Sequence, residues 1–248
     1  MVTPPPAVTP SPPIVAPTPA VAAPPSGEEI RRSVDRVIRN FSCAQLNANP
    51  VNDVWTVSGF VATPQDLRRL QNDLAVAGVP SPRVDAEVVQ RPLCEVAELL
   101  HANTAVRRGE AALRIGLNSP NRTYRDGEQL IVDVTSQTGP ERFLYVSYVD
   151  KEGNILHLLP KPGRADNKAA AGKTLRFGQE KEYMISEPFG TDMIIALASP
   201  VKLFDSVRPE TEAGPKYFAD LQASLRKHNP SGSTGPIVSN YILITTSP

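Results

Sequence analysis

The sequence predicts an α+β fold, in which a small αββαβ domain precedes a mainly antiparallel β-sandwich with one late helix. Up to about residue 92, apolar residues recur alternately at helical and at strand spacing. Beyond about residue 110 strand spacing dominates, and turn residues separate many short segments. The first 25 residues include 10 prolines and cannot pack into a core. We therefore expect a Pro-rich disordered linker at 1–27, an α/β domain at 28–92, a connecting helix at 93–109 and a β-sandwich domain at 110–248.

Helix caps and alternation define the elements of the first domain. Ser26 and Glu29 form a capping-box pattern ahead of a helix with apolar residues at helical spacing. Thr63 followed by Pro64 predicts the start of a second helix, which should end at Gly78. The remaining segments predict strands at 44–49, 54–61 and 83–89, with a turn at 49–53.

The second half reads as strands separated by turns, apart from a short connecting helix at 93–102 and a helix at 214–227. Asp150 to Asn154, with Gly153, is typical of a hairpin turn. Strands are expected at 112–117, 130–135, 143–149, 155–160, 174–177, 183–186, 193–198 and 241–246.

Two features of the first domain carry a family resemblance. The strand Val57-Ser58-Gly59-Phe60-Val61 precedes a helix, and a Gly78-Val79 turn precedes the last strand. This arrangement, over about residues 28–90, is similar to the BON domain. The resemblance implies an αββαβ fold in a bacterial envelope, where some members of that family bind anionic phospholipid.

A second resemblance covers about residues 110–246. It rests on motifs in a fixed order: Tyr124–Leu130, Leu144–Asp150, Leu158-Leu159-Pro160, Pro188-Phe189-Gly190 and Ile194–Ser199. They resemble an uncharacterised bacterial family known only as a domain of unknown function. Such domains are commonly fused to serine/threonine protein kinases and caspase-like proteins, so the resemblance implies a fold and a genomic context but no activity.

Charge and hydropathy exclude several classes of function. Lys and Arg together number 26, as do Asp and Glu, so there is no global basic excess for nucleic acid. No apolar stretch is long enough to span a membrane, and no signal peptide follows Met1. We expect Met1 to begin a piece of a longer protein, tethered in the periplasm or elsewhere outside the cytoplasm through a missing N-terminal part.

The linker and the cysteines support that location. Polyproline-rich segments are stiff spacers, although a tail without a spacing role has the same composition. The chain has two cysteines, Cys43 and Cys94, which suit one structural disulfide in an oxidising compartment. Two buried reduced thiols are the alternative.

The sequence predicts no catalytic residue, no cofactor site and no metal site. No G-x-S-x-G motif occurs, and the three histidines and two cysteines lack ligand spacing. His157, between Leu156 and Leu158, is expected to point away from the apolar face, as a surface histidine or one whose hydrogen bonds are satisfied. Gly172-Lys173-Thr174 ends like a phosphate-binding loop, but Asn167 replaces its first glycine and a strand follows.

One group of residues remains as a candidate binding site. Lys161, Arg164, Lys168 and Lys173 lie close together in one loop, which could bind an anionic phospholipid, a glycan or an acidic partner, or be merely solvated. We expect a non-enzymatic, extracytoplasmic ligand- or protein-binding region, the sensor part of a transmembrane serine/threonine kinase or a related envelope protein. The alternatives are a scaffolding subunit of an envelope or secretion complex and a hydrolase with an unrecognised site.

Overall fold

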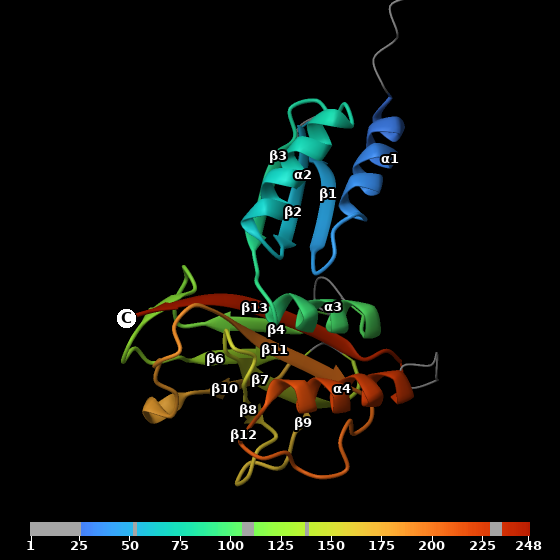
Figure 1. Cartoon of the computed structure of the whole chain (residues 1–248). Helices are drawn as coiled ribbons and strands as arrows, with labels where there is room; N and C mark the ends of the chain where they lie inside the picture. The colour runs from blue at the N-terminus through green and yellow to red at the C-terminus, as the bar shows by residue number, and fades with distance from the viewer. Residues whose placement is uncertain (1–25, 52–53, 106–111, 137–138, 229–234) are drawn as a thin grey trace, which may run out of the picture.

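The protein consists of two folded parts joined end to end (Figure 1). This computed structural model describes residues 26–51, 54–105, 112–136, 139–228 and 235–248. The first 25 residues, and with them most of the predicted linker, lie outside that range. The α+β class, with a β-sandwich and one late helix, is confirmed.

The first part has the predicted order of elements. These are α1 (Gly27–Ile38), β1 (Gln45–Val51), β2 (Val54–Val61), α2 (Pro64–Val76) and β3 (Arg83–Val88). The capping box at the start of α1 forms, since the Glu29 N–H donates to Ser26 Oγ and the Ser26 N–H donates to Glu29 Oε2. The sheet order is β1-β2-β3, antiparallel between the first pair and parallel between the second. Both helices cover one face of it, over a core that contains the fully buried Val34, Val57, Leu70 and Leu74.

The predicted turn at 49–53 is wrong at its start. Strand β1 continues through Pro50 to Val51, with Pro50 paired to Trp55. A proline is tolerated here because β1 is an edge strand, so the missing N–H leaves no neighbour without a partner. Residues 52 and 53 lie outside the described range.

The second part stacks a three-stranded sheet on a larger one. The small sheet has the order β10-β6-β4, and the large sheet has the order β12-β8-β7-β11-β13-β5, with β9 beside β7. Every pairing is antiparallel except that of β13 with β5. The strands are β4 (Arg114–Leu117), β5 (Thr123–Arg125), β6 (Val132–Thr135), β7 (Arg142–Val149), β8 (Ile155–Leu159), β9 (Lys168–Ala169), β10 (Thr174–Phe177), β11 (Thr191–Ser199), β12 (Thr211–Glu212) and β13 (Val238–Ser247).

Strand β11 is buried on both faces. Its residues 193–198 have no exposed surface. Ile194, Ala196 and Ala198 belong to the core beneath the small sheet, whereas the alternate residues belong to the core beneath the helices. This double burial explains why β11 is a continuous apolar run rather than an alternating one. The second part is therefore a three-layer structure, with small sheet, large sheet and helices.

Two helices form the third layer. They are α3 (Leu93–Asn103), predicted as a connecting helix, and α4 (Gly214–His228), the predicted late helix. Leu93, Val96 and Leu100 of α3 are buried in the same core as Tyr217 and Leu221 of α4. Thus α3 packs on the sandwich, on the face that is turned toward the first part (Figure 1).

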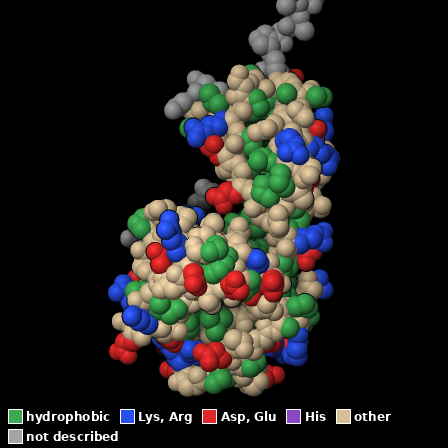
Figure 2. All heavy atoms as spheres, turned by 60° about the vertical axis from the view of Figure 1, so that its left-hand side comes forward, with side chains coloured by type: hydrophobic (Ala, Val, Ile, Leu, Met, Phe, Trp, Pro, Cys, Tyr) green, Lys and Arg blue, Asp and Glu red, His purple; other side chains and the backbone are tan. Residues whose placement is uncertain are grey.

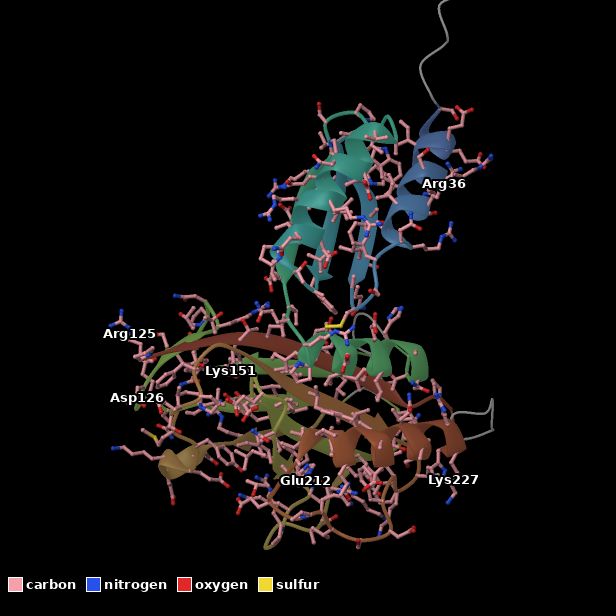
Figure 3. The ribbon with its side chains drawn as sticks, viewed as in Figure 1. Arg36, Arg125, Asp126, Lys151, Glu212 and Lys227 are labelled. Carbon is pink, nitrogen blue, oxygen red and sulfur yellow. A yellow bond between two sulfur atoms is a disulfide. The ribbon has the colours of Figure 1, made fainter. Side chains whose placement is uncertain are left out.

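A disulfide and several side chains hold the two parts together. The Cys43–Cys94 bond, predicted as one of two alternatives, connects the segment before β1 to α3 (Figure 3). Beside it, the Tyr241 hydroxyl on β13 donates to Gln45 Oε1 at 2.7 Å, and the Tyr241 ring contacts Phe60 edge-on. Burial raises the pKa of Tyr241 to about 12, so the phenol stays protonated and able to donate.

The remaining differences concern short segments. The predicted strand at 183–186 is absent, because this segment pairs with its neighbour only through the Gln129–Met184 bridge. Its alternation has another cause, since Tyr183 and Ile185 point into the core while Met184 is exposed. Strands β5, β9 and β12, of two or three residues each, are too short to produce a period that the sequence could reveal.

Candidate functional site

Lys161, the first of the four predicted basic residues, is held by acidic neighbours. Its Nζ donates to Glu182 Oε1 at 2.8 Å, to Glu210 Oε1 at 2.7 Å and to the Tyr183 hydroxyl at 3.1 Å. Burial alone would lower the pKa of Lys161, but these hydrogen bonds outweigh it and raise the pKa. The charge of Lys161 is therefore used within the protein.

The other three basic residues have different surroundings. Arg164 faces Lys161 across a tight backbone turn and lies over the Phe177 ring, 4.5 Å from its centroid. Lys168 Nζ is 3.5 Å from a carboxylate oxygen of Glu141, and Lys173 is exposed. On the face seen in Figure 2, the coloured Lys and Arg side chains are scattered among acidic ones. Anion binding by this loop stays a prediction.

A buried polar network beneath α4 was not predicted as a unit. His157 on β8 is 3% exposed, and its Nε2 lies 2.8 Å from Glu212 Oε1 on β12. The guanidinium of Arg208 binds both carboxylate oxygens of Glu212 and donates to Asp220 Oδ2 on α4 at 2.7 Å. Figure 3 shows Glu212 below α4. The predicted direction of His157 is confirmed, because it points away from the face that carries Leu156 and Leu158. It is not a surface residue, because α4 covers that second face, and its hydrogen bonds are satisfied as expected.

Burial and hydrogen bonds shift the pKa values of Glu212 and His157 in this network. Burial would raise the pKa of Glu212, but the hydrogen bonds from Arg208 and His157 reverse this effect and lower the pKa. Burial lowers the pKa of His157, against the opposing effect of Glu212. His157 is therefore neutral near pH 7, with its proton on Nε2 directed at the carboxylate. Its Nδ1 accepts from Ser147 Oγ at 2.9 Å.

Ser147, His157 and Glu212 thus have the order of hydrogen bonds found in serine hydrolases. Two observations distinguish this group from an active site. The serine contacts Nδ1 rather than the Nε2 that contacts it in the usual triad. Ser147 is 1% exposed, as is Tyr217 of α4, whose ring lies edge-on to the His157 ring with the centroids 4.8 Å apart. No substrate carbonyl can reach the Ser147 oxygen in this arrangement.

An open cleft of about 440 Å³ adjoins the network, with Glu212 in its wall. It lies between the β8–β12 edge and the segment that leads from Tyr183 to Pro188. Its volume is within the range of small-molecule sites. The apolar wall includes Met184, which is 41% exposed and one of few large apolar side chains at the described surface. Other apolar residues of the lining are Leu130, Ile155, Leu156, Ile185 and Pro188.

The polar lining of the cleft is acidic. It includes Asp150, Glu187 and Glu212, and no Lys, Arg or His. Asp150 accepts three hydrogen bonds from its own turn, two of them from the amide nitrogens of Asn154. Glu187 is exposed and forms no ion pair with the residues that the structure describes. A cleft lined by acids without bases attracts cations and repels anions.

The Tyr148 ring, which lines the cleft, is held by a hydrogen bond to the buried Asp192. Its hydroxyl donates to Asp192 Oδ2 at 2.7 Å, and Asp192, which has no exposed surface, also accepts from the Lys151 N–H and from Thr246 Oγ1. Burial raises the pKa of Asp192 despite these donors, and burial also raises the pKa of Tyr148. The Tyr148 side of the cleft is therefore held in place by a buried, hydrogen-bonded carboxylate.

Within the described ranges, no group of three His, Cys, Asp or Glu side chains could hold a metal ion. No helix in the part of the chain that the structure covers is long and apolar enough to cross a membrane.

Comparison with known proteins gives one finding. No curated protein and no solved structure matches this chain. A family model matches residues 123–202, a segment that includes Ser147 and His157 but ends before Arg208, Glu212 and α4. The second part of the chain therefore contains, at these residues, a domain of the family described as "Domain of unknown function (DUF4384)".

Proposed function

We propose that this chain is a non-enzymatic, extracytoplasmic recognition module whose cleft beside Glu212 binds a small cation with an apolar part. The observation that carries the proposal is the lining of the cleft, where three carboxylates and several apolar side chains, including the exposed Met184, occur without any basic residue. An ammonium group would be attracted by Glu187 and Asp150, while a short alkyl chain would cover Met184 and Leu156.

The locked state of the reactive groups supports a binding role over a catalytic one. Ser147 and His157 are buried and fully engaged with each other and with Glu212. A nucleophile that no substrate reaches performs no acyl transfer. In this proposal the network is a support that holds the Glu212 wall of the cleft in place.

The location rests on the disulfide and on the resemblance noted in the sequence. A structural disulfide is typical of oxidising compartments. Domains similar to the second part are commonly fused to serine/threonine kinases, which gives the finer form of the proposal: the sensor part of a transmembrane kinase or a related envelope protein. We also propose, from the resemblance over about residues 28–90, that the first part is a BON-like domain.

The binding proposal is tested with two probes of equal length and opposite charge, hexylammonium and hexanoate. Each is titrated at millimolar concentration into ¹⁵N-labelled protein, and amide shifts are followed. We expect hexylammonium to shift the amides of Leu156, Met184 and Ile185, and hexanoate to leave them unchanged. Glu187→Gln should weaken hexylammonium binding about twofold to fivefold, the effect of one partly solvated charge pair.

Asp126→Asn serves as the matched control, because Asp126 is an exposed carboxylate of the same domain outside the cleft (Figure 3). Its affinity for hexylammonium should equal that of the wild type. Equal shifts with both probes, or the same loss of affinity in Asp126→Asn as in Glu187→Gln, would show that the cleft does not select cations.

A further inference from the structure

A groove of about 570 Å³ lies between α3 and α4 and shares no lining residue with the cleft beside Glu212. The two helices lie side by side over the large sheet (Figure 1). Residues that line the groove recur at intervals of three or four along each helix, so the groove follows both helix axes. On α3 they include Glu95, Val96, Leu99 and Ala102, and on α4 they include Phe218, Ala219, Gln222 and Arg226.

The turn between β7 and β8 fixes one end of this groove. Gly153 in that turn has φ 88°, and a Cβ there would lie 2.5 Å from Pro92 Cγ at the start of α3. A Cβ on Gly214, the first residue of α4, would lie 1.9 Å from the Gly153 carbonyl oxygen. Both helices therefore begin at the same turn. They run in the same direction from it, so the groove between them follows both helix axes (Figure 1).

The groove is long and apolar at its base. From Pro215 to Arg226 it extends over three helical turns, about 16 Å at 1.5 Å per residue. Val96 is buried, and Leu99 and Phe218 are partly buried against the core beneath the helices. Ala102 and Ala219 are exposed and small, so they leave room for side chains from outside. A linear apolar trough of this length matches one face of a helix, with anchors at i, i+3, i+4 and i+7.

The rim of the groove is mainly acidic. Glu95 and Glu98 on α3 and Glu152 on the β7–β8 turn line it, and Arg226 is its one basic residue. Glu95 is paired with Arg91 at 2.6 Å, whereas Glu98 and Glu152 form no ion pair within the described part of the chain. The rim therefore favours an occupant with Lys or Arg beside its apolar face.

We propose that the groove between α3 and α4 binds a basic amphipathic helix of a partner protein. A second copy of this chain suits the groove less well, because a two-fold contact pairs each patch with itself and would place acidic rims together. The proposal concerns a surface separate from the cleft and does not depend on the binding of cations there.

The test uses two labelled 18-residue probe peptides with Leu at i, i+3, i+4 and i+7, one with Lys and one with Glu at the other positions. Fluorescence anisotropy measures binding to the full chain. We expect the Lys peptide to bind at least tenfold more tightly than the Glu peptide. Ala102→Lys with Ala219→Lys should weaken binding of the Lys peptide at least tenfold, because both new side chains fill the groove with like charge. Both positions are exposed on helices, and Lys follows Ala closely in helix propensity, so the variants should fold.

Val76→Lys is the matched control, since Val76 is an exposed apolar residue (89%) on α2, in the other part of the molecule. It should bind the Lys peptide as the wild type does. Glu98→Lys with Glu152→Lys should abolish the preference for the Lys peptide while the apolar contacts remain. Equal affinity for both peptides, or unchanged binding after the alanine substitutions, would overturn the proposal. So would sedimentation that shows a wild-type dimer which those substitutions dissociate, because the groove would then bind a second copy.

Discussion

Loss of the Cys43–Cys94 bond should destabilise the first part of the chain far more than the sandwich. The bond closes a loop with a sequence separation of 51 residues, which contains β1 to β3. Constraining a loop of that length in the unfolded chain is worth about 4 kcal/mol in the chain-entropy model. This corresponds to an increase of about a thousandfold in the unfolded population of the first part.

The single tryptophan makes the measurement specific. Trp55 is buried on β2, so its fluorescence in a urea titration follows the first part, whereas far-UV circular dichroism follows both. Wild-type protein is compared with the same protein under reductant, which keeps both thiols in place, and with Cys43→Ala/Cys94→Ala. The Trp55 transition should move to lower urea in both, with a larger loss in the double variant, since it also leaves cavities at two buried positions. A loss of less than about 1 kcal/mol on reduction would refute the loop-closure argument.

Three further predictions concern the sandwich. Burial lowers the pKa of His157 below 6.5, so the unfolded chain binds more protons than the folded chain below that pH. The free energy of unfolding should therefore fall as the pH drops from 6.5, and it should fall less steeply in His157→Gln. Urea titrations at pH 7.5 and 5.5 measure both differences. Arg208→Ala leaves the buried carboxylate of Glu212 without its main partner and should cost about 3 kcal/mol, whereas an unchanged urea midpoint would mean that water replaces the guanidinium. Gly153→Ala places a Cβ against Pro92 at positive φ and should cost about 2 kcal/mol or more. A thermal midpoint equal to that of the wild type would contradict the close contact described between Gly153 and Pro92.

Local signals in the sequence were sufficient for the regular elements. The Ser26–Glu29 box and the Thr63-Pro64 pair each act within one turn of chain, so their meaning does not depend on the rest of the fold. The apolar run at 193–198 also identified its strand, because a strand with two cores has no polar face. Pro50 was misleading, because a proline ends a central strand but is tolerated in a strand at the edge of a sheet, and the local sequence does not show which of the two β1 is.

The candidate site lacked such signals. Glu212 meets His157 across 55 positions of sequence, and β12, which carries Glu212, is only two residues long. An alternation of Leu156, His157 and Leu158 predicts a strand but cannot tell which face is covered by a helix that lies 60 residues further on. The cleft and the groove arise where separate segments meet, so neither has a local pattern. Only the basic loop had one, and there the acids that neutralise Lys161 come from distant positions.

The cystine also determines how the molecule would carry mechanical load. Tension applied at Ser26 would pass along α1 to Cys43, cross the covalent bond to Cys94 and enter α3 on the sandwich. The intervening strands β1, β2 and β3 form a side loop off that route and would bear no direct strain. Tension can therefore unfold the chain only as far as Cys43, and the segment from β1 to β3 stays folded and attached to the sandwich.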